Sequence, residues 1–343
     1  MSHLPFPSVA RSLPPVRPAR PRETAQVRFP DGRVFEAAVG TPLEAFIAAV
    51  RRPEDPPIVS ALVEGRITEL TCPVEHDISI EPIAITHSDG MRIYQRSLCF
   101  LLTAAAHGLF PGTRIVIDHS LTLSGLYCHM DGREPLSAEE LAGLEARMRA
   151  LVEADLPIVK HRLPLEEARA IFARQGYEDK LRLLDFRPKD YLTVYELNGL
   201  YDYFYGHMVP STGYLSLFAL QPYPPGFILR FPRRREPHAL PPFRDSPKLA
   251  AVFREYGEWL QFLELDDLAD LNRAADEGRM REIILVTEAL HAQRLAEIAR
   301  EIASRYPKVR LVLLAGPSSA GKTTTAKRLG VQLLAQGIRP LPI

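Results

Sequence analysis

The sequence has few of the residues that cross-link a protein or anchor it in a membrane. Its 343 residues include three cysteines and one tryptophan, and Lys+Arg and Asp+Glu balance at 42 each. Thiols with neither paired nor metal-ligand spacing exclude a disulfide framework and a zinc site, which favours a cytoplasmic protein. No apolar run reaches the ~20 residues of a membrane span. The balanced charge gives no global basic field, so RNA is a possible partner that net charge does not support.

Proline is frequent, and the remaining composition is that of a globular protein. There are 31 prolines, and 46% of the residues are apolar and 24% charged. The length predicts two or three domains. Residues 1–22 are rich in Pro and Arg and poor in large apolar side chains, which predicts a flexible arm.

Residues 23–85 predict a compact unit with the order ββαβββ. Pro30-Asp-Gly32 lies between two short strands, which is a hairpin signal. Thr41 is the predicted cap of a helix that starts at Pro42. The predicted elements are strands 26–29 and 33–36, helix 42–50, and strands 58–63, 66–70 and 77–81.

Residues 90–235 predict a second, mixed α+β domain, and residues 236–306 predict a linker and a helical region. Ser137-Ala-Glu-Glu140 is a capping box at the start of a helix. The predicted elements are helices 95–109, 137–154 and 165–175, strands 114–118, 125–129, 193–197 and 227–231, and a helix 287–306.

The segment Gly316-Pro-Ser-Ser-Ala-Gly-Lys-Thr323 fits the phosphate-binding pattern G-x-x-x-x-G-K-[ST]. An apolar run, Val309–Ala315, predicts a buried parallel strand before it, and Thr323–Ala335 predicts a helix after it. The strand expected before the loop and the helix expected after it make this pattern match a candidate phosphate-binding site. The alternative is a chance match in a glycine-containing turn.

The pattern predicts ATP and Mg²⁺ as cofactors. Lys322 would reach the β- and γ-phosphates as the catalytic cation, and the Thr323 hydroxyl would bind Mg²⁺. Main-chain N–H groups and the helix N-terminus would bind phosphate oxygens. The predicted cofactor-binding residues are Gly316, Ser318, Ser319, Ala320, Gly321, Lys322, Thr323 and Thr324.

No Asp or Glu follows the loop, so a second acid for Mg²⁺ is missing. Residues 307–343 are therefore expected to be the beginning of a P-loop domain in a truncated chain. Leu311 and Leu313 are expected to stay partly exposed.

Several phrases resemble the N-terminal part of threonyl-tRNA synthetases. Phe29-Pro-Asp-Gly32 lies in a unit similar to the β-grasp module called TGS. The phrases similar to the editing-type second domain are Leu109-Phe-Pro-Gly112, Leu136-Ser-Ala-Glu-Glu-Leu141, Glu153-Ala-Asp-Leu-Pro-Ile158 and Val209-Pro-Ser-Thr-Gly213. The resemblance implies a β-grasp domain followed by an α+β synthetase-like domain.

The four polar side chains that the editing domain uses are replaced in this sequence. The positions of its His-x-x-x-His pair read Cys99 and Thr103, and those of its later Cys and His read Phe204 and Met208. His207 lies one residue away from the pattern. The resemblance therefore implies that editing chemistry is absent.

The synthetase-like half followed by the glycine loop resembles bacterial nucleoside kinases related to uridine kinase and phosphoribulokinase. That resemblance implies phosphoryl transfer from ATP–Mg²⁺ to a nucleoside hydroxyl. One alternative is an RNA- or tRNA-interacting regulatory protein with a nucleotide-sensing loop. Another is a TGS-containing GTPase, which would need an Asn-Lys-x-Asp motif that the sequence does not contain.

Other polar and aromatic groups are weighed as sites and favoured as structural. Tyr201-Asp-Tyr-Phe-Tyr205 could stack a base, and packing in a core is the alternative. Trp259 has helical spacing with its aromatic neighbours and is expected in a core. The polar set, whose spacing matches no ligand pattern, is His87, Asp89, His119, His129 and Asp131; the aromatic neighbours of Trp259 are Phe253, Tyr256 and Phe262.

Overall fold

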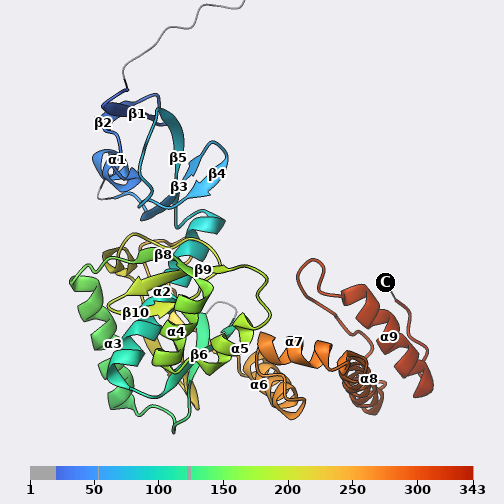
Figure 1. Cartoon of the computed structure of the whole chain (residues 1–343). Helices are drawn as coiled ribbons and strands as arrows, with labels where there is room; N and C mark the ends of the chain where they lie inside the picture. Colours follow the sequence, from blue (N-terminus) through green and yellow to red (C-terminus); the bar gives the residue numbers. More distant parts are fainter. Residues whose placement is uncertain (1–20, 53, 122–124, 343) are drawn as a thin grey trace, which may run out of the picture. The chain divides into compact units, whose positions relative to one another are not determined.

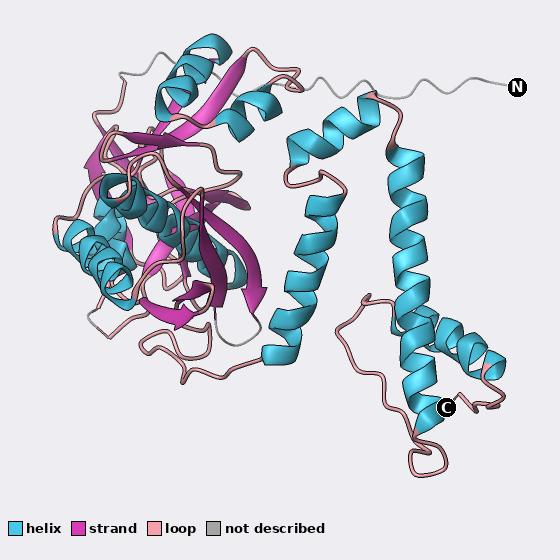
Figure 2. Cartoon of the chain, turned by 90° about the horizontal axis from the view of Figure 1, so that it is seen from below, coloured by secondary structure: helices cyan, strands magenta, loops and turns pink. Residues whose placement is uncertain are grey.

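The computed structural model describes residues 21–52, 54–121 and 125–342, so the predicted arm 1–22 lies almost wholly outside the described residues. The chain divides into two compact units. Unit 1 contains the chain up to Tyr177 with Pro188–Phe253, and unit 2 contains Glu178–Arg187 with the chain from Arg254. Strands are confined to unit 1 among the described residues (Figures 1 and 2). The chain is a mixed α+β protein with several sheets, as the sequence predicts.

The first sheet of unit 1 has five strands in the order β2-β1-β5-β3-β4 and carries one helix. Strand β1 runs parallel to β5, and the other pairs are antiparallel. The predicted order ββαβββ is confirmed. The elements are β1 (Thr24–Arg28), β2 (Val34–Ala38), α1 (Leu43–Val50), β3 (Ile58–Val63), β4 (Arg66–Thr68) and β5 (Ile78–Ala84).

The predicted cap of α1 is wrong. The cap residue is Pro42, and it makes no side-chain cap bond. The main chain of Thr41 is bonded instead to Ala38 and Val74, which keeps Thr41 in the extended segment before the helix.

The rest of unit 1 contains a four-stranded sheet, β11-β12-β7-β6, and a three-stranded sheet, β10-β9-β8, in which β8 is an edge strand. The helices pack beside these sheets. The elements are α2 (Ser88–Leu109), β6 (Arg114–Leu121), β7 (Gly125–Asp131), α3 (Ala138–Glu153), β8 (Val159–Pro164), α4 (Leu165–Gln175), β9 (Tyr191–Leu197), β10 (Leu200–Asp202), the short 3₁₀ helix η1 (Thr212–Leu215), β11 (Ala219–Tyr223) and β12 (Gly226–Arg230).

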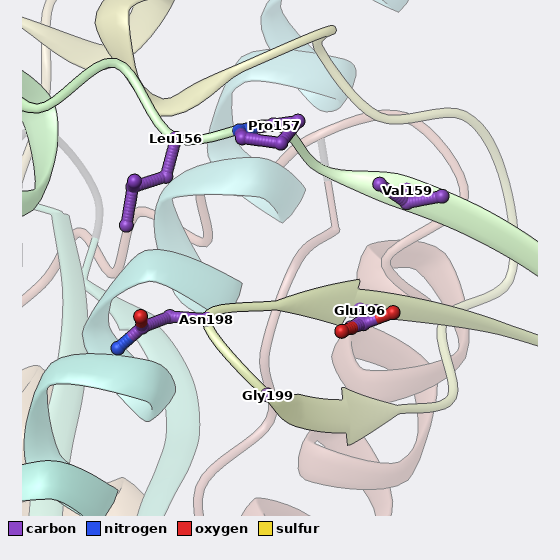
Figure 3. A pocket seen from close by; sticks show the side chains of 6 residues that line it. All are labelled: Leu156, Pro157, Val159, Glu196, Asn198 and Gly199. Atoms are coloured by element: carbon purple, nitrogen blue, oxygen red, sulfur yellow. The ribbon is translucent and has the colours of Figure 1, made fainter.

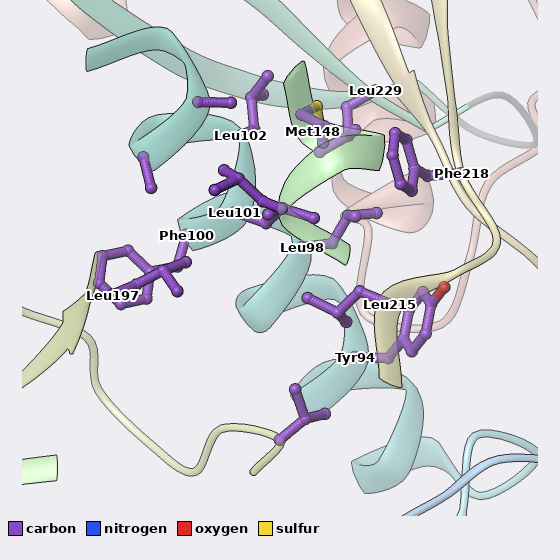
Figure 4. Packing of buried hydrophobic residues seen from close by; sticks show 14 of the residues in the cluster. Tyr94, Leu98, Phe100, Leu101, Leu102, Met148, Leu197, Leu215, Phe218 and Leu229 are labelled. Atoms are coloured by element: carbon purple, nitrogen blue, oxygen red, sulfur yellow. The ribbon is translucent and has the colours of Figure 1, made fainter. Parts of the chain in front are cut away.

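Helix α2 is the centre of the largest hydrophobic core. Leu98, Leu101 and Leu102 are fully buried, and side chains from the neighbouring strands and from α3 surround the helix (Figure 4). The hydroxyl of Tyr94 donates to the carbonyl of Leu217 at 2.9 Å, which satisfies a polar atom in this core. A helix that is apolar around most of its circumference is expected to be buried in this way.

Helix α2 begins at Ser88, seven residues before the predicted start. The His87 side chain caps it by accepting from the amide of Asp89 at 3.2 Å. Asp89-Gly90 resembles a turn in the sequence, but Gly90 is needed for packing. A Cβ on Gly90 would lie 2.1 Å from the carbonyl oxygen of Ala84.

The elements that depend on residues close together in the chain agree best with the sequence-based predictions. The Ser137 capping box is present in both directions, and α4 has the predicted bounds. Elements with polar sequences or weak periodicity were not predicted. These are β8, β10, β11 and α5 (Glu178–Leu184).

Unit 2 is helical. Its core joins α8 to α9 through Leu295, Ala299, Leu329 and Leu333. Its helices are α5, α7 (Leu268–Asp276), α8 (Met280–Ser304), α9 (Lys322–Ala335) and the part of α6 (Pro247–Phe262) that follows Phe253.

The predicted strand Val309–Ala315 is wrong. This segment has no regular structure, and Leu311 and Leu313 are 66% and 82% exposed. A strand requires a partner strand to satisfy its N–H and C=O groups, and the described part of unit 2 contains none. The expected exposure of the two leucines is confirmed.

The predicted aromatic core around Trp259 is also wrong. Tyr256 and Phe262 are 56% and 74% exposed, although the indole of Trp259 contacts the Phe262 ring. Phe253 instead stacks on His119, with ring centroids 4.1 Å apart. Helical spacing places these side chains on one face but does not supply an apolar partner for that face.

Glu69, which follows β4, connects the first sheet to the three-stranded sheet. Its side chain is 5% exposed. The carboxylate accepts from the Tyr195 hydroxyl on β9, from the Lys160 ammonium on β8 at 2.9 Å, and from the amide of Met208 at 3.1 Å. His207 Nδ1 lies 3.5 Å from the same carboxylate.

These donors determine the ionisation of Glu69. Burial raises the pKa of the carboxyl group, but the neighbouring His207 and the hydrogen bonds from Tyr195 and Lys160 outweigh burial and lower it to about 2. The folded-state pKa is therefore below the usual 4.5. The carboxylate stabilises the fold above about pH 4.5, and this contribution is lost as the pH falls towards 2.

We expect Glu69→Gln to lower the free energy of unfolding at pH 7 by about 3 kcal/mol, because it removes the charge that pairs with Lys160. The pH dependence should identify the cause. Wild-type stability should fall between pH 4.5 and 2 more steeply than that of the variant, in urea titrations at fixed pH. The matched control is Glu81→Gln on β5, which is exposed. Parallel pH profiles for Glu69→Gln and wild type would contradict this role.

Candidate functional site

The glycine loop turns sharply into the N-terminus of α9. Residues 318–320 form a turn, Ser319 and Gly321 have φ angles of 62° and 74°, and the helix begins at Lys322. Left-handed residues in such a turn bring successive N–H groups towards one side, which is the geometry of an anion-binding nest. Thr323 and Thr324 lie exposed in the first turn of α9.

The Lys322 side chain folds back over the loop. Its ammonium donates to the carbonyl oxygen of Pro317 at 2.6 Å. A Cβ on Gly316 would lie 3.6 Å from the Lys322 side chain. The lysine therefore lies against the loop, where a phosphate bound to the N–H groups would meet it. These features fit a phosphate group, although the predicted strand before the loop is not formed.

The positions of the four replaced editing residues form a largely apolar region. Phe204 packs against Phe100 with ring centroids 5.2 Å apart, and Met208 is 2% exposed. The Thr103 hydroxyl donates to the carbonyl of Cys99 one turn earlier in α2. No polar group of these side chains is directed at a common point.

The remaining candidate groups of this region have structural roles. Burial raises the pKa of the Cys99 thiol to about 12, so the thiol stays protonated and is a poor nucleophile or metal ligand. His207 lies beside Glu69, and its main-chain carbonyl accepts from Arg96 at 2.7 Å. Across residues 21–52, 54–121 and 125–342, no three His, Cys, Asp or Glu side chains gather closely enough to hold a metal ion.

A basic and aromatic surface lies on one face of β8 and β9. Alternate residues of a strand share a face, so Lys160 and Arg162 lie on the face that carries Tyr191. The Arg162 guanidinium carbon is 3.7 Å from the centroid of the Tyr191 ring, and Lys189 Nζ is 5.6 Å from it. We call these four residues, Lys160, Arg162, Lys189 and Tyr191, the β8 strip.

The aromatic cluster at residues 201–205 is divided between core and surface. Phe204 packs in the core, whereas the Tyr205 side chain is 91% exposed. Tyr205 lies in the loop that Glu69 binds at Met208. Core packing is therefore confirmed for Phe204, whereas stacking on a base stays a prediction for Tyr205.

Four of the five polar residues considered as a metal or acid/base site have structural contacts, as favoured from the sequence. His87 caps α2, Asp89 pairs with Arg92, and Asp131 pairs with Arg114. His119 is covered by the ring of Phe253.

Sequence reasoning missed the residues around Glu69 and the β8 strip. Two signals were available. The alternation in Val-Lys-His-Arg-Leu is typical of a half-exposed strand, and a basic strand beside tyrosines is a signature of nucleic-acid surfaces.

More than half of the chain is similar to threonyl-tRNA synthetases. The chain is 30% identical over 195 residues to the threonine–tRNA ligase of Symbiobacterium thermophilum and 30% identical over 199 residues to threonine–tRNA ligase 1 of Bacillus subtilis. These matches cover 57% and 58% of this chain and 30% and 31% of the relatives. The enzyme of Bacillus velezensis is 26% identical over 257 residues, which are 75% of this chain and 37% of the relative.

The chain thus spans about a third of the length of the curated relatives it matches. No family model matches the chain. The resemblance of the N-terminal region to threonyl-tRNA synthetases is confirmed by these relatives, whereas a fusion to a uridine kinase is not shown.

The nucleoside-kinase interpretation is wrong. The relatives, from several bacteria, are named threonine–tRNA ligases, which are enzymes but neither kinases nor uridine kinases. These names favour a protein related to tRNA synthetases and to RNA, which was the alternative interpretation. Every helix of the described residues is too short or too polar to cross a membrane.

We expect unit 1 not to hydrolyse mischarged aminoacyl-tRNA, because Cys99, Thr103, Phe204 and Met208 supply no converging polar groups. The measurement is release of the amino acid from mischarged threonine tRNA by the purified chain, compared with spontaneous hydrolysis. His207→Ala is the control for residual chemistry at the one polar neighbour. Hydrolysis above background that His207→Ala removes would overturn this expectation.

Proposed function

We propose that the chain is an RNA-interacting regulatory protein of the cytoplasm, that its synthetase-like unit binds tRNA or a tRNA-like RNA, and that its glycine loop senses a nucleotide. The observation that carries the proposal is the similarity of more than half of the chain to threonine–tRNA ligases. In this proposal residues 23–85 are a TGS-like β-grasp domain and residues 90–235 correspond to the synthetase's second domain.

The β8 strip is the proposed RNA contact. Two cations beside a half-buried aromatic ring can bind phosphate, while the accessible part of the ring meets a base. Tyr205, at 91% exposure, offers a second ring on the loop next to the strip's sheet. A net charge of zero does not oppose this, because phosphate binding depends on the local arrangement of cations.

The glycine loop is the proposed nucleotide sensor, with ATP and Mg²⁺ as ligands. The main chain of Gly316 and of Ser318–Gly321 would hold phosphate oxygens, and Thr324 would lie near them. Lys322 would exchange its bond to the Pro317 carbonyl for a charge-assisted bond to phosphate. Thr323 would supply a hydroxyl to Mg²⁺, which supplies charge neutralisation when bound.

The RNA proposal predicts that Arg162→Ala combined with Lys189→Ala weakens binding of a tRNA transcript. The slope of log K against log salt should become shallower by about 1.4–1.8, since each lost phosphate contact removes ~0.7–0.9. The matched control is Arg147→Ala with Arg174→Ala, which removes the same charge from α3 and α4 of the same unit. Binding measured by filter retention from 50 to 300 mM salt tests this. Equal slopes for both double variants would refute the strip as the contact.

The nucleotide proposal predicts that Lys322→Ala abolishes binding of ATP–Mg²⁺ in calorimetry, because the cation that meets the phosphates is lost. Lys327→Ala, further along α9 and exposed, should leave binding unchanged. Identical affinities for Lys322→Ala and the wild-type chain would disprove the assignment of the loop.

A further inference from the structure

A small hollow lies where β8 and β9 separate. Before β8 the chain turns away towards Ser211, and after β9 it turns at Asn198 and Gly199. The hollow between them has a volume of ≈ 210 Å³. Figure 3 shows the side chains of Leu156 and Asn198 on one side and that of Glu196 on the other. The lining residues are Leu156, Pro157, Val159, Glu196, Asn198 and Gly199.

The hollow ends at a polar row that crosses the three-stranded sheet. Val159 on β8 is opposite Glu196 on β9, and Glu196 is opposite Tyr201 on β10. His161, two residues along β8, shares this face and donates from Nε2 to the Glu196 carboxylate at 2.8 Å. The Tyr201 hydroxyl also bonds to this carboxylate.

These partners fix the carboxylate and leave part of it available. An ionised carboxylate accepts at about four positions, and His161 and Tyr201 occupy two of them. Tyr201 is itself held in place, because the Gln175 side chain at the end of α4 bonds to both its amide and its carbonyl, at 2.9 and 2.7 Å. Glu196 is therefore a positioned acceptor at the edge of a mostly apolar hollow, which the Asn198 amide also lines.

We infer that this hollow binds an unpaired guanine base of the RNA, an inference that rests on the proposed function. Guanine alone among the four bases presents two neighbouring donors, N1–H and the exocyclic N2 amine, to one carboxylate. Uracil places one donor between two acceptors, and cytosine and adenine present an amine beside an acceptor. Recognition of splayed-out bases in single-stranded RNA is the usual mode of sequence reading by proteins.

The other residues that line the hollow match the flat ring and the O6 atom of guanine. Leu156, Pro157 and Val159 offer apolar surface to a flat ring, and the Asn198 amide can donate to the guanine O6. The volume is below the ~300–1,000 Å³ of pockets for drug-sized ligands, so it suits one base rather than a whole nucleotide. The edge strand β8 carries the hollow's Val159 on one face and the strip's Arg162 on the other, so one RNA strand can meet both at the edge of the sheet.

The test compares short single-stranded RNAs that differ at one position, guanosine against inosine, which lacks only the N2 amine. Wild-type protein should bind the guanosine RNA roughly tenfold more tightly. Glu196→Gln should bring the ratio close to one, because the amide cannot accept twice. Glu167→Gln, on exposed α4 surface, is the control and should keep the ratio.

A second variant keeps the test decisive if Glu196→Gln fails to fold. Val159 is 40% exposed on an edge strand, so Val159→Trp can fill the hollow without entering the core. It should also remove the preference for guanosine while leaving the salt-dependent affinity in place. A preference that survives Val159→Trp would overturn the inference.

The failure of this inference is distinguishable from the failure of the proposed function. Equal, salt-dependent binding of both RNAs would reject the guanine site and keep RNA binding. If neither RNA binds, the proposed function fails, and the hollow is judged by NMR titration with the mononucleotides GMP and IMP and with free arginine. Binding of GMP with contacts at Val159 supports the site, whereas equal binding of IMP, binding of arginine instead, or no shift overturns it.

Discussion

The buried carboxylate of Glu69 is the interaction on which the arrangement of unit 1 depends. It comes from the five-stranded sheet and binds β8 through Lys160, β9 through Tyr195 and the following loop through the amide of Met208. A buried charge without such donors would cost several kcal/mol, so the sheets are held in the one arrangement that supplies all of them. The surface proposed to meet RNA consists of the same three segments. Glu69 therefore fixes the position of Lys160, a member of the β8 strip, on the face of the sheet that carries the strip.

The interior of the synthetase-like part and its surface have different chemistry. In the interior, Phe204 and Met208 pack against α2, and the Cys99 thiol stays protonated. Side chains of this kind stabilise a fold but offer no acid, base or metal ligand. At the surface, Arg162 stacks on Tyr191 and Tyr205 is almost wholly exposed. This distribution suits a unit that binds RNA without reacting with it.

The sequence predicts the elements that local chemistry determines and misses those that depend on distant partners. The Ser137 capping box, α4 and β3 follow from caps and periodicity over a few residues. Glu69 could not be recognised, because its donors lie 91–139 residues away. The segment Val309–Ala315 has the composition of a strand, yet strand formation requires a ladder that composition alone cannot supply. The predicted aromatic core around Trp259 was wrong for a related reason. Helical periodicity identifies which side chains share a face, but it does not identify the residues that cover that face. The β8 strip was missed because Arg162 meets Tyr191 only across the sheet.

The glycine loop is exposed to solvent, and the helix that follows it is packed against its neighbour. Helix α9 is held against α8 by Leu329 and Leu333, whereas residues 311–321 are exposed. Within the loop, the Lys322 ammonium donates to the Pro317 carbonyl at 2.6 Å. A phosphate oxygen is a better acceptor for an ammonium group than a neutral carbonyl, so a nucleotide can displace this bond at a net gain. Because α9 packs against α8, the rearrangement that accompanies this exchange is expected in the exposed loop. In the proposed sensor, the response to a ligand would therefore lie in the exposed residues 311–321.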